Sequence, residues 1–242
     1  MPGFHALEVA ETTPLAGVST VVTFAVPDEL AAEYAHRAGQ YLTIRTSLNG
    51  RRLMRRYSIC SPPGTLQFAA KRRPNGEFSA YVNEQLRAGD VLDVMTPMGA
   101  FTLPAAEGPR RVVGVAVGSG ITPVRAIALH VLATEPDSQV VLVCANRTRR
   151  HAMFADDLAA HAERYGDRLT ILHVLSDDPS APATAYGRLD PELLAALVDG
   201  HALAGDAWLL SGPYALVDAL KDRLVKEGVH DEAVRTEAFQ RP

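Results

Sequence analysis

The sequence contains little cysteine. Its 242 residues include only two, Cys60 and Cys144, so a four-thiolate iron–sulfur cluster or a four-cysteine zinc site within this chain is excluded. None of the eight histidines stands in a His-x-x-x-His or mixed Cys/His spacing, and no metal site is predicted. Both cysteines lie in strand-like apolar stretches, and we expect two reduced, packed thiols.

Long apolar runs and a strong charge of one sign are also missing. No stretch of about 18 apolar residues occurs, so no transmembrane helix is predicted. The start of the chain lacks the basic segment and apolar stretch of a secretory signal. The formal net charge of −4 disfavours a dedicated nucleic-acid binder, whose domain is usually strongly basic. We therefore expect a cytoplasmic protein that binds neither membrane nor nucleic acid.

The composition that remains is ordinary for a globular protein, with 47 % hydrophobic and 21 % charged residues. The pattern changes near residues 108–109. Before this point, short β-branched or aromatic stretches are separated by turns, which predicts a small antiparallel barrel or sandwich. The predicted strands are residues 4–9, 18–26, 41–46, 56–60, 66–71 and 91–95, and the predicted helices are residues 28–35 and 78–86.

After this point, apolar strands alternate with helices, which predicts a doubly wound parallel sheet. The predicted strands are residues 112–117, 140–144, 169–175, 208–210 and 234–239, and the predicted helices are residues 124–132, 152–164, 191–198 and 214–226. The sequence thus predicts two domains, residues 1–107 and residues 108–242.

A glycine-rich turn follows the first strand of the second half. Gly118, Ser119 and Gly120 lead to a helix for which Thr122 is the predicted N-cap and Pro123 the first helical residue. Free N–H groups and the helix dipole favour an anion there, and ligands bind at this edge of an open α/β sheet. We favour a phosphate site over an ordinary strand-to-helix turn. Because the full G-x-G-x-x-G pattern is missing, the turn alone does not specify a dinucleotide.

A second candidate site lies in the first half. Arg55 is suited to bind a phosphate through two hydrogen bonds, Tyr57 offers a flat face, and the Ser58 hydroxyl can bond a ring heteroatom. The alternative is an exposed basic strand with one half-buried tyrosine. The nearby basic segment at Lys71 and the free N–H groups at the helix start near Ser79 favour ligand binding.

These motifs together resemble the ferredoxin–NADP(+) reductase superfamily over nearly the whole chain. The motifs are Arg55-x-Tyr57-Ser58, Gly76-x-x-Ser79, Gly118-Ser119-Gly120-x-Thr122-Pro123 and Ser211-Gly212-Pro213, in this order. The segments 57–61, 145–148, 153–154 and 236–239 are similar to the reductase components of bacterial oxygenases of the phenylacetyl-CoA and ketosteroid type. Each motif alone gives moderate support for this resemblance, and the occurrence of four motifs in the same order argues against a chance match.

The resemblance implies a flavin-dependent NAD(P)H oxidoreductase, with an N-terminal antiparallel β-barrel for FAD and a C-terminal α/β domain for NAD(P)H. It implies that Arg55 and Ser79 bind the FAD pyrophosphate, Tyr57 packs on the isoalloxazine, and Ser58 lies near its N5. Glu237 is a candidate catalytic residue near the flavin, and Phe239 a candidate lid over the ring, although both residues are equally explained as the close of the last strand. The remaining candidate contacts to FAD are Lys71, Gly76 and Phe78.

For the nucleotide, the resemblance implies that the turn cradles the NAD(P)H pyrophosphate through Gly118, Ser119, Gly120 and Thr122. Asn146 and Arg147 fall where the family binds the adenosine ribose, and an arginine there suits a 2′-phosphate, which favours NADPH over NADH. The alternative is a solvated basic loop. Ser211, followed by Gly212 and Pro213, stands where the family often has a cysteine beside the nicotinamide, so we expect slower or differently positioned hydride transfer.

The resemblance also bears on the electron acceptor. Similar proteins continue into a plant-type [2Fe–2S] domain, whereas this sequence ends at Pro242, so we expect either a separate ferredoxin or oxygenase component as acceptor or a shortened chain. A basic cluster of Arg51, Arg52, Arg55 and Arg56 could receive an acidic partner. The alternatives are a diaphorase that reduces free flavin, ferric complexes or quinones, and a non-catalytic binding module. The oligomeric state is not predicted.

Overall fold

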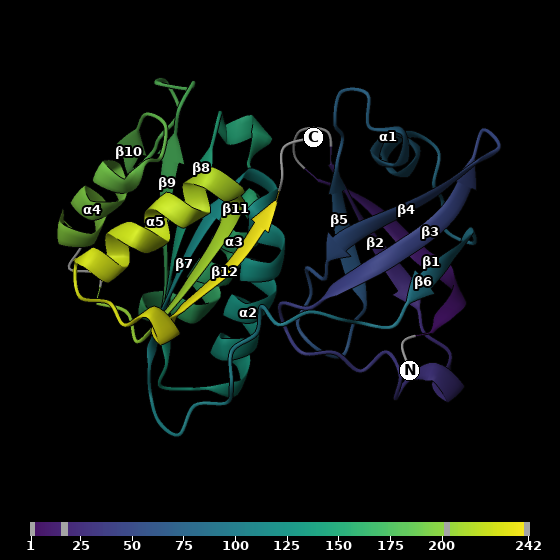
Figure 1. Cartoon of the computed structure of the whole chain (residues 1–242), viewed down its shortest axis with the longest axis horizontal. Helices are drawn as coiled ribbons and strands as arrows, with labels where there is room; N and C mark the ends of the chain where they lie inside the picture. Colours follow the sequence, from purple (N-terminus) through teal and green to yellow (C-terminus); the bar gives the residue numbers. More distant parts are fainter. Residues whose placement is uncertain (1–2, 16–18, 201–203, 240–242) are drawn as a thin grey trace.

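The computed structural model describes residues 3–15, 19–200 and 204–239, which form two six-stranded sheets side by side (Figure 1). Every strand pair in the first sheet is antiparallel, and every pair in the second is parallel. The predicted fold class is therefore confirmed. The predicted division at residue 107 falls in the connection between the two sheets, and the exact boundary stays a prediction.

The first sheet has the strand order β4-β3-β6-β1-β2-β5. A bridge between Ile59, just after β4, and Phe68 of β5 joins its two ends and closes the barrel. The helix α1 (Glu77–Glu84) covers one opening and buries Phe78 and Val82. The strands are β1 (Phe4–Leu15), β2 (Ser19–Ala25), β3 (Tyr41–Leu48), β4 (Arg51–Ser58), β5 (Gln67–Lys71) and β6 (Val91–Met95). Val18, the first residue of the predicted second strand, lies outside the described residues.

The second sheet has the order β10-β9-β8-β7-β11-β12, so the chain reverses direction across the sheet beside β7. Ligands bind at such a switch point because the loops from neighbouring strands diverge there. The strands are β7 (Arg111–Val117), β8 (Gln139–Asn146), β9 (Leu169–Leu175), β10 (Ala185–Tyr186), β11 (Ala207–Pro213) and β12 (Val234–Phe239). The helices are α2 (Ile121–Thr134), α3 (Ala155–Tyr165), α4 (Pro191–Gly200) and α5 (Tyr214–Lys226).

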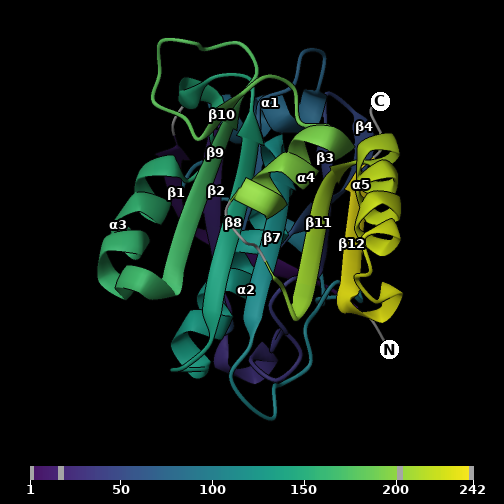
Figure 2. The same ribbon diagram turned by 90° about the vertical axis from the view of Figure 1, so that its left-hand side faces the viewer.

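Helices cover both faces of this sheet, with α4 and α5 on the outer face and α2 and α3 on the face toward the barrel (Figures 1 and 2). Val112 and Ala116 of β7 pack in the cluster that contains α2, whereas Val113 and Val115 pack with α4 and α5. Successive side chains of a strand point to opposite faces. This explains why β7 is apolar at almost every position.

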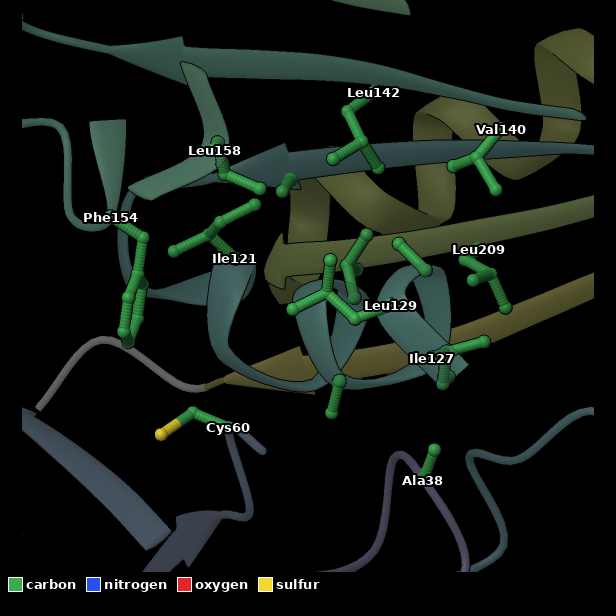
Figure 3. Close-up of a cluster of buried hydrophobic side chains, with 14 of the residues drawn as sticks. Ala38, Cys60, Ile121, Ile127, Leu129, Val140, Leu142, Phe154, Leu158 and Leu209 are labelled. Carbon is green, nitrogen blue, oxygen red and sulfur yellow. The ribbon is translucent and has the colours of Figure 1, made fainter. Parts of the chain in front are cut away.

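The helix α2 also forms the contact between the two halves. Figure 3 shows Ala38 and Cys60 on its barrel side and Val140, Leu142 and Leu209 on its other side. Gly39 has φ +94°, and a Cβ there would lie 1.9 Å from the Phe101 carbonyl oxygen and 2.8 Å from Cδ1 of Ile127 in α2. The close approach therefore requires glycine. Cys60 and Cys144 are both buried free thiols, as predicted.

The strands predicted at residues 4–9 and 56–60 run instead over Phe4–Leu15 and Arg51–Ser58. Three predictions about helices were also wrong. The helix predicted at residues 28–35 is one 3-10 turn, Asp28–Leu30, because Tyr34 turns into the barrel core, where its hydroxyl donates a 2.6 Å hydrogen bond to the Val94 carbonyl. Thr122 is not the N-cap of α2; Gly120 is, and the Thr122 hydroxyl donates to the Ser119 carbonyl instead. The helix predicted from residue 152 begins at Ala155, because Phe154 has φ 60°.

The short strand β10 was not predicted, because two residues carry no periodic signal. Single 3-10 turns also occur at Gly118–Gly120, Arg149–His151, Gly166–Arg168 and Asp231–Ala233. Over the described ranges, no helix combines the length and apolar character that crossing a bilayer requires. The same residues hold no cluster of three or more His, Cys, Asp or Glu side chains suited to a metal ion.

Candidate functional site

Two cavities meet at the carboxyl edge of the second sheet. The first, here called the barrel cleft, has a volume of about 500 Å³ and lies between the barrel, the turn after β7 and the end of β12. It is lined by Tyr41, Arg55, Arg56, Tyr57, Ser58, Ala69, Lys71, Arg73, Gly76, Phe78, Ser79, Ser119, Thr122, Glu237, Ala238 and Phe239. The structure thus brings together all nine residues expected to contact the flavin, from both halves of the chain.

Tyr57 forms an aromatic wall of the barrel cleft. Its ring centroid lies 5.0 Å from that of Phe68 and 5.6 Å from that of Phe78, in tilted arrangements. Burial raises the pKa of Tyr57 to about 12, so its hydroxyl stays protonated at neutral pH. The packing fixes the ring orientation and leaves a flat surface on the cleft, which suits an aromatic ligand.

Ser58 and Glu237 form a polar pair in the same cleft. Ser58 Oγ donates a 2.5 Å hydrogen bond to Oε1 of Glu237. Burial raises the pKa of Glu237, and the hydrogen bond from Ser58 opposes this rise. Ser58 ends β4, and β12 delivers Glu237 beside it because β12 pairs with β11 in the parallel sheet. The pair can therefore hold a proton at the barrel cleft at a higher pH than an ordinary carboxyl would.

Cations line the end of the barrel cleft near α1. Arg55 and Arg73 are exposed there, and Gly76 is the N-cap of α1. The Ser79 hydroxyl donates to the Gly76 carbonyl at 2.9 Å and accepts from the Arg73 amide at 3.1 Å. A Cβ at Gly76 would lie 2.4 Å from Ser79 Oγ. Ser79 therefore shapes the start of α1, and the two guanidinium groups offer the charge for a phosphate.

The second cavity, here called the sheet cavity, has a volume of about 850 Å³. It lies at the carboxyl ends of β7, β8 and β11. Its lining residues are Lys71, Val117, Gly118, Ala145, Asn146, Arg147, His151, Ser176, Gly187, Arg188, Leu189, Pro213, Tyr214, Ala215 and Leu216. The structure places Asn146, Arg147 and Pro213 in this cavity together with the first glycine of the turn.

The turn after β7 is divided between the two cavities. Gly118, with φ +58°, lines the sheet cavity, whereas Ser119 and Thr122 line the barrel cleft. Gly120 is buried and lines neither, since its Cβ would lie 2.2 Å from the Ser211 carbonyl oxygen. The sequence analysis expected the whole turn to contact the nucleotide pyrophosphate. Gly120 instead lets the turn after β7 pack closely against the backbone of Ser211 in β11.

Ser211 and Gly212 belong to the wall behind this turn. Ser211 is only 1 % exposed, and its Oγ has no hydrogen-bond partner among the described residues. A Cβ at Gly212 would lie 2.8 Å from Cβ of Val117. Ser211 lines neither cavity, so its hydroxyl is packed beneath the turn and does not face the ligand space.

Lys71 stands where the two cavities join and lines both. Its Nζ donates a 3.0 Å hydrogen bond to the His151 carbonyl. Burial lowers the pKa of Lys71, and the positive charge of Arg147 lowers it further. Arg147 itself makes an exposed 3.2 Å ion pair with Asp177. Lys71 therefore places an amino group with a lowered pKa at the junction of the two cavities.

Several lining residues were missed by the sequence analysis. Tyr41 lines the barrel cleft, and His151, Arg188 and Tyr214 line the sheet cavity. Arg73, which also lines the barrel cleft, belongs to the basic segment at Lys71 that the sequence analysis associated with ligand binding. Tyr214 directly follows the Ser211-Gly212-Pro213 motif, so an aromatic at that helix start was a usable signal. No sequence signal indicated Arg188, because it lies 40 residues after Thr148 and belongs to none of the recognised motifs.

Comparisons with known proteins match both halves of the chain. An oxidoreductase FAD-binding domain matches residues 7–103, and an oxidoreductase NAD-binding domain matches residues 115–222. One component of the 1,2-phenylacetyl-CoA epoxidase of Escherichia coli is 38 % identical, over 100 % of this chain and 69 % of its own length. The chain belongs to the ferredoxin–NADP(+) reductase family. It is an FAD- and NAD-binding oxidoreductase of that family, as the sequence predicts.

Other members of the ferredoxin–NADP(+) reductase family agree. The ferredoxin reductase component of a 3-ketosteroid-9-alpha-monooxygenase of Rhodococcus rhodochrous is 34 % identical over 90 % of this chain, which spans 60 % of that protein. Among solved structures, an Amycolatopsis cytochrome P450 reductase has a TM-score of 0.80 with 26 % identity, covering 98 % of this chain and 71 % of its own. A Neisseria gonorrhoeae ferredoxin NADP+ reductase with bound FAD and NADP has a TM-score of 0.77, covering 97 % and 98 %; at 19 % identity it shows the fold alone.

Proposed function

We propose that this chain takes a hydride from NAD(P)H in the sheet cavity, transfers it to FAD in the barrel cleft, and delivers the electrons to a separate protein such as a ferredoxin or an oxygenase component. The observation that carries this proposal is that the two cavities share Lys71 and the turn after β7. A ligand in each cavity would therefore meet its neighbour at this junction.

The barrel cleft suits FAD by the chemistry of its lining. Arg55 and Arg73 supply the charge for a pyrophosphate, and Gly76 leaves the start of α1 without a side chain. Tyr57 and Phe239 both line the cleft and offer aromatic faces to a flat ring. When bound, the flavin accepts a hydride and can return electrons one at a time. The protein supplies binding, orientation and the electrostatic environment.

Ser58 and Glu237 are the proposed polar groups near the reacting end of the flavin. Because the pKa of Glu237 is raised, its carboxyl can hold a proton, and the Ser58 hydroxyl can pass one to or from a ligand atom. A positioned acid with a pKa near the working pH is an effective proton donor. Ser211 acts by packing under the turn, where it sets the position of Gly120 and Gly212.

The sheet cavity suits a pyridine nucleotide. Gly118 leaves space for a pyrophosphate, Lys71 offers it a charge, and Tyr214 can stack on the adenine at the outer end. Arg147 and Arg188 line the same cavity as two cations. They support the choice of NADPH, because a 2′-phosphate needs a positive partner. The Asp177 carboxylate already pairs with Arg147 and would repel a 2′-phosphate. NADH is therefore the competing hydride donor.

The direct test is an anaerobic titration of the FAD-saturated protein with NADPH and NADH in parallel. The proposal expects a yellow protein that bleaches with nucleotide, and lower concentrations of NADPH than of NADH should suffice. Failure to retain FAD after reconstitution, or flavin that neither nucleotide reduces, contradicts it. The latter result would favour the binding module.

The acceptor is tested separately. Cytochrome c reduction that depends on added ferredoxin supports the proposed acceptor, whereas direct turnover of free flavin, ferric complexes or quinones favours the diaphorase. We also propose a cytoplasmic location, because the free thiols of Cys60 and Cys144 suit a reducing compartment.

A further inference from the structure

A buried arginine outside both cavities joins the three segments that carry the site. Arg125 lies on α2, and its Nη1 donates a 2.6 Å hydrogen bond to the Cys60 carbonyl of the barrel. Its Nε and Nη2 donate to the two carboxylate oxygens of Asp157 on α3, at 2.7 and 2.9 Å. Its guanidinium carbon lies 4.7 Å from the centroid of the Phe154 ring.

Each partner of Arg125 leads directly to the site. Cys60 comes two residues after Ser58 of the barrel cleft. The first turn of α2 follows Gly118 and Ser119, which line the two cavities. Phe154 is the N-cap of α3 and Asp157 lies in its first turn, shortly after the loop with Arg147 and His151 in the sheet cavity.

The backbone conformation of Phe154 indicates that the start of α3 is held in place by the residues packed around it. Phe154 has φ 60°, a region that bulky L-residues rarely occupy and that persists only where neighbouring structure enforces it. Its ring is buried in the α2 cluster and lies against the guanidinium of Arg125. The turn from the loop of residues 147–151 into α3 is thus packed against Arg125.

Hydride transfer depends steeply on the separation of donor and acceptor, and a misplacement of about 1 Å can cost a hundredfold in rate. In this chain the donor and acceptor would be held by different halves. A planar guanidinium makes several directional bonds at once, which a lysine does not. Arg125 is suited to fix that separation.

We propose that Arg125 is a positioning residue for hydride transfer, which sets the relative placement of the barrel cleft and the sheet cavity through Cys60, Asp157 and Phe154. The inference rests on the proposed function of the two cavities. Arg125 lines neither cavity, so it acts through the segments that it joins.

A second arginine, Arg110, whose side chain is largely covered, provides a matched control. Arg110 makes a two-bond pair with Glu135 at 3.0 and 2.6 Å, and the side chains of Arg110 and Arg125 are 13 % and 10 % exposed. Glu135 follows the far end of α2, about 15 Å along the helix from Arg125. Loss of either arginine removes a comparable buried pair, but only Arg125 contacts Cys60.

The experiment compares Arg125→Met with Arg110→Met in the full, FAD-saturated chain by anaerobic stopped-flow. For Arg125→Met we expect the rate constant of flavin bleaching at saturating nucleotide to fall about tenfold to a hundredfold. The nucleotide dissociation constant should stay close to that of the wild type, and the long-wavelength charge-transfer band should weaken. Arg110→Met should lose similar thermal stability and keep both the rate and the band.

Equal slowing in the two variants, or an unchanged rate in Arg125→Met, overturns the inference. If Arg125→Met does not fold, the same comparison is made between Asp157→Asn and its control Glu135→Gln. Flavin bleaching should then slow only in Asp157→Asn. A wild type that neither nucleotide reduces contradicts the proposed function instead, so the two failures are distinguishable. Arg125→Lys keeps the positive charge but loses the planar set of N–H donors. Its bleaching rate should therefore lie between those of Arg125→Met and the wild type.

Discussion

Ser58 and Glu237 are 179 positions apart in the sequence, yet Ser58 Oγ donates a 2.5 Å hydrogen bond to Oε1 of Glu237. One residue ends a strand of the barrel, and the other lies in the last strand of the parallel sheet. The pair therefore forms only when both halves are folded and docked. It marks the barrel cleft as a site that neither half builds alone.

Glu237→Gln should change the pH dependence of stability. Because burial raises the pKa of Glu237 in the folded state, the folded protein binds this proton more tightly than the unfolded chain does. Wild-type stability is therefore lost as pH rises from the ordinary carboxyl pKa through the raised one. We expect the variant to match the wild type near pH 4 and to be more stable near pH 8 in urea unfolding. A pH-independent difference argues against a buried, raised carboxyl.

Lys71→Arg should flatten the pH dependence of nucleotide binding. Since burial and the charge of Arg147 lower the pKa of Lys71, its ammonium loses its charge below the ordinary lysine range. The dissociation constant for NADP+ should therefore already rise in the wild type as the pH approaches the ordinary lysine pKa from below. An arginine stays charged throughout, so the variant should show a smaller rise. Lys221→Arg, on α5 and paired with Asp231, is the control.

Arg55→Ala should weaken FAD retention. A charge-assisted bond to a phosphate is worth about 1.5–3 kcal/mol, so the dissociation constant should rise about tenfold to a hundredfold. Arg52→Ala removes an exposed arginine of the same strand that does not line the barrel cleft and should leave retention unchanged. Equal retention in the two variants, measured by flavin release on dilution, refutes the role of Arg55.

Tyr214→Ala should raise the dissociation constant of the nucleotide. Tyr214 is 63 % exposed and lines the sheet cavity, and stacking of a base on an aromatic ring is worth about 1–3 kcal/mol. We expect an increase of about tenfold, with the bleaching rate at saturation preserved. Tyr186→Ala, a similarly exposed tyrosine outside the cavity, should bind normally.

Ser211→Ala should stabilise the protein by about 1 kcal/mol, because it removes a buried hydroxyl that has no partner among the described residues. Thermal unfolding measures this gain. The bleaching rate in the same variant tests whether the hydroxyl itself takes part in hydride transfer. A large fall in rate would show that it does, contrary to its packed position; an unchanged rate would assign Ser211 to the wall of the turn.

Much of the fold follows from local pattern. The strand predicted at residues 91–95, the strand at 169–175 and the helix at 214–226 have the observed bounds, because period and turn residues act over short distances. The helix predicted at 28–35 failed where the burial of Tyr34 overrode the local preference. The start of α2 was misplaced because Gly120 packs against Ser211, a contact that no local pattern encodes.

The order of the motifs, the change from barrel to alternating sheet and hence the family could be predicted before folding was considered, since these are properties of residue type and spacing along one chain. Tertiary structure alone decided which cavity each motif faces: Gly118 enters the sheet cavity, while Ser119 and Thr122 face the barrel cleft. It also decided that Arg125 meets Cys60 and Asp157. These positions are set where the two halves dock, because backbone approach and side-chain packing across the interface fix the direction in which each side chain points.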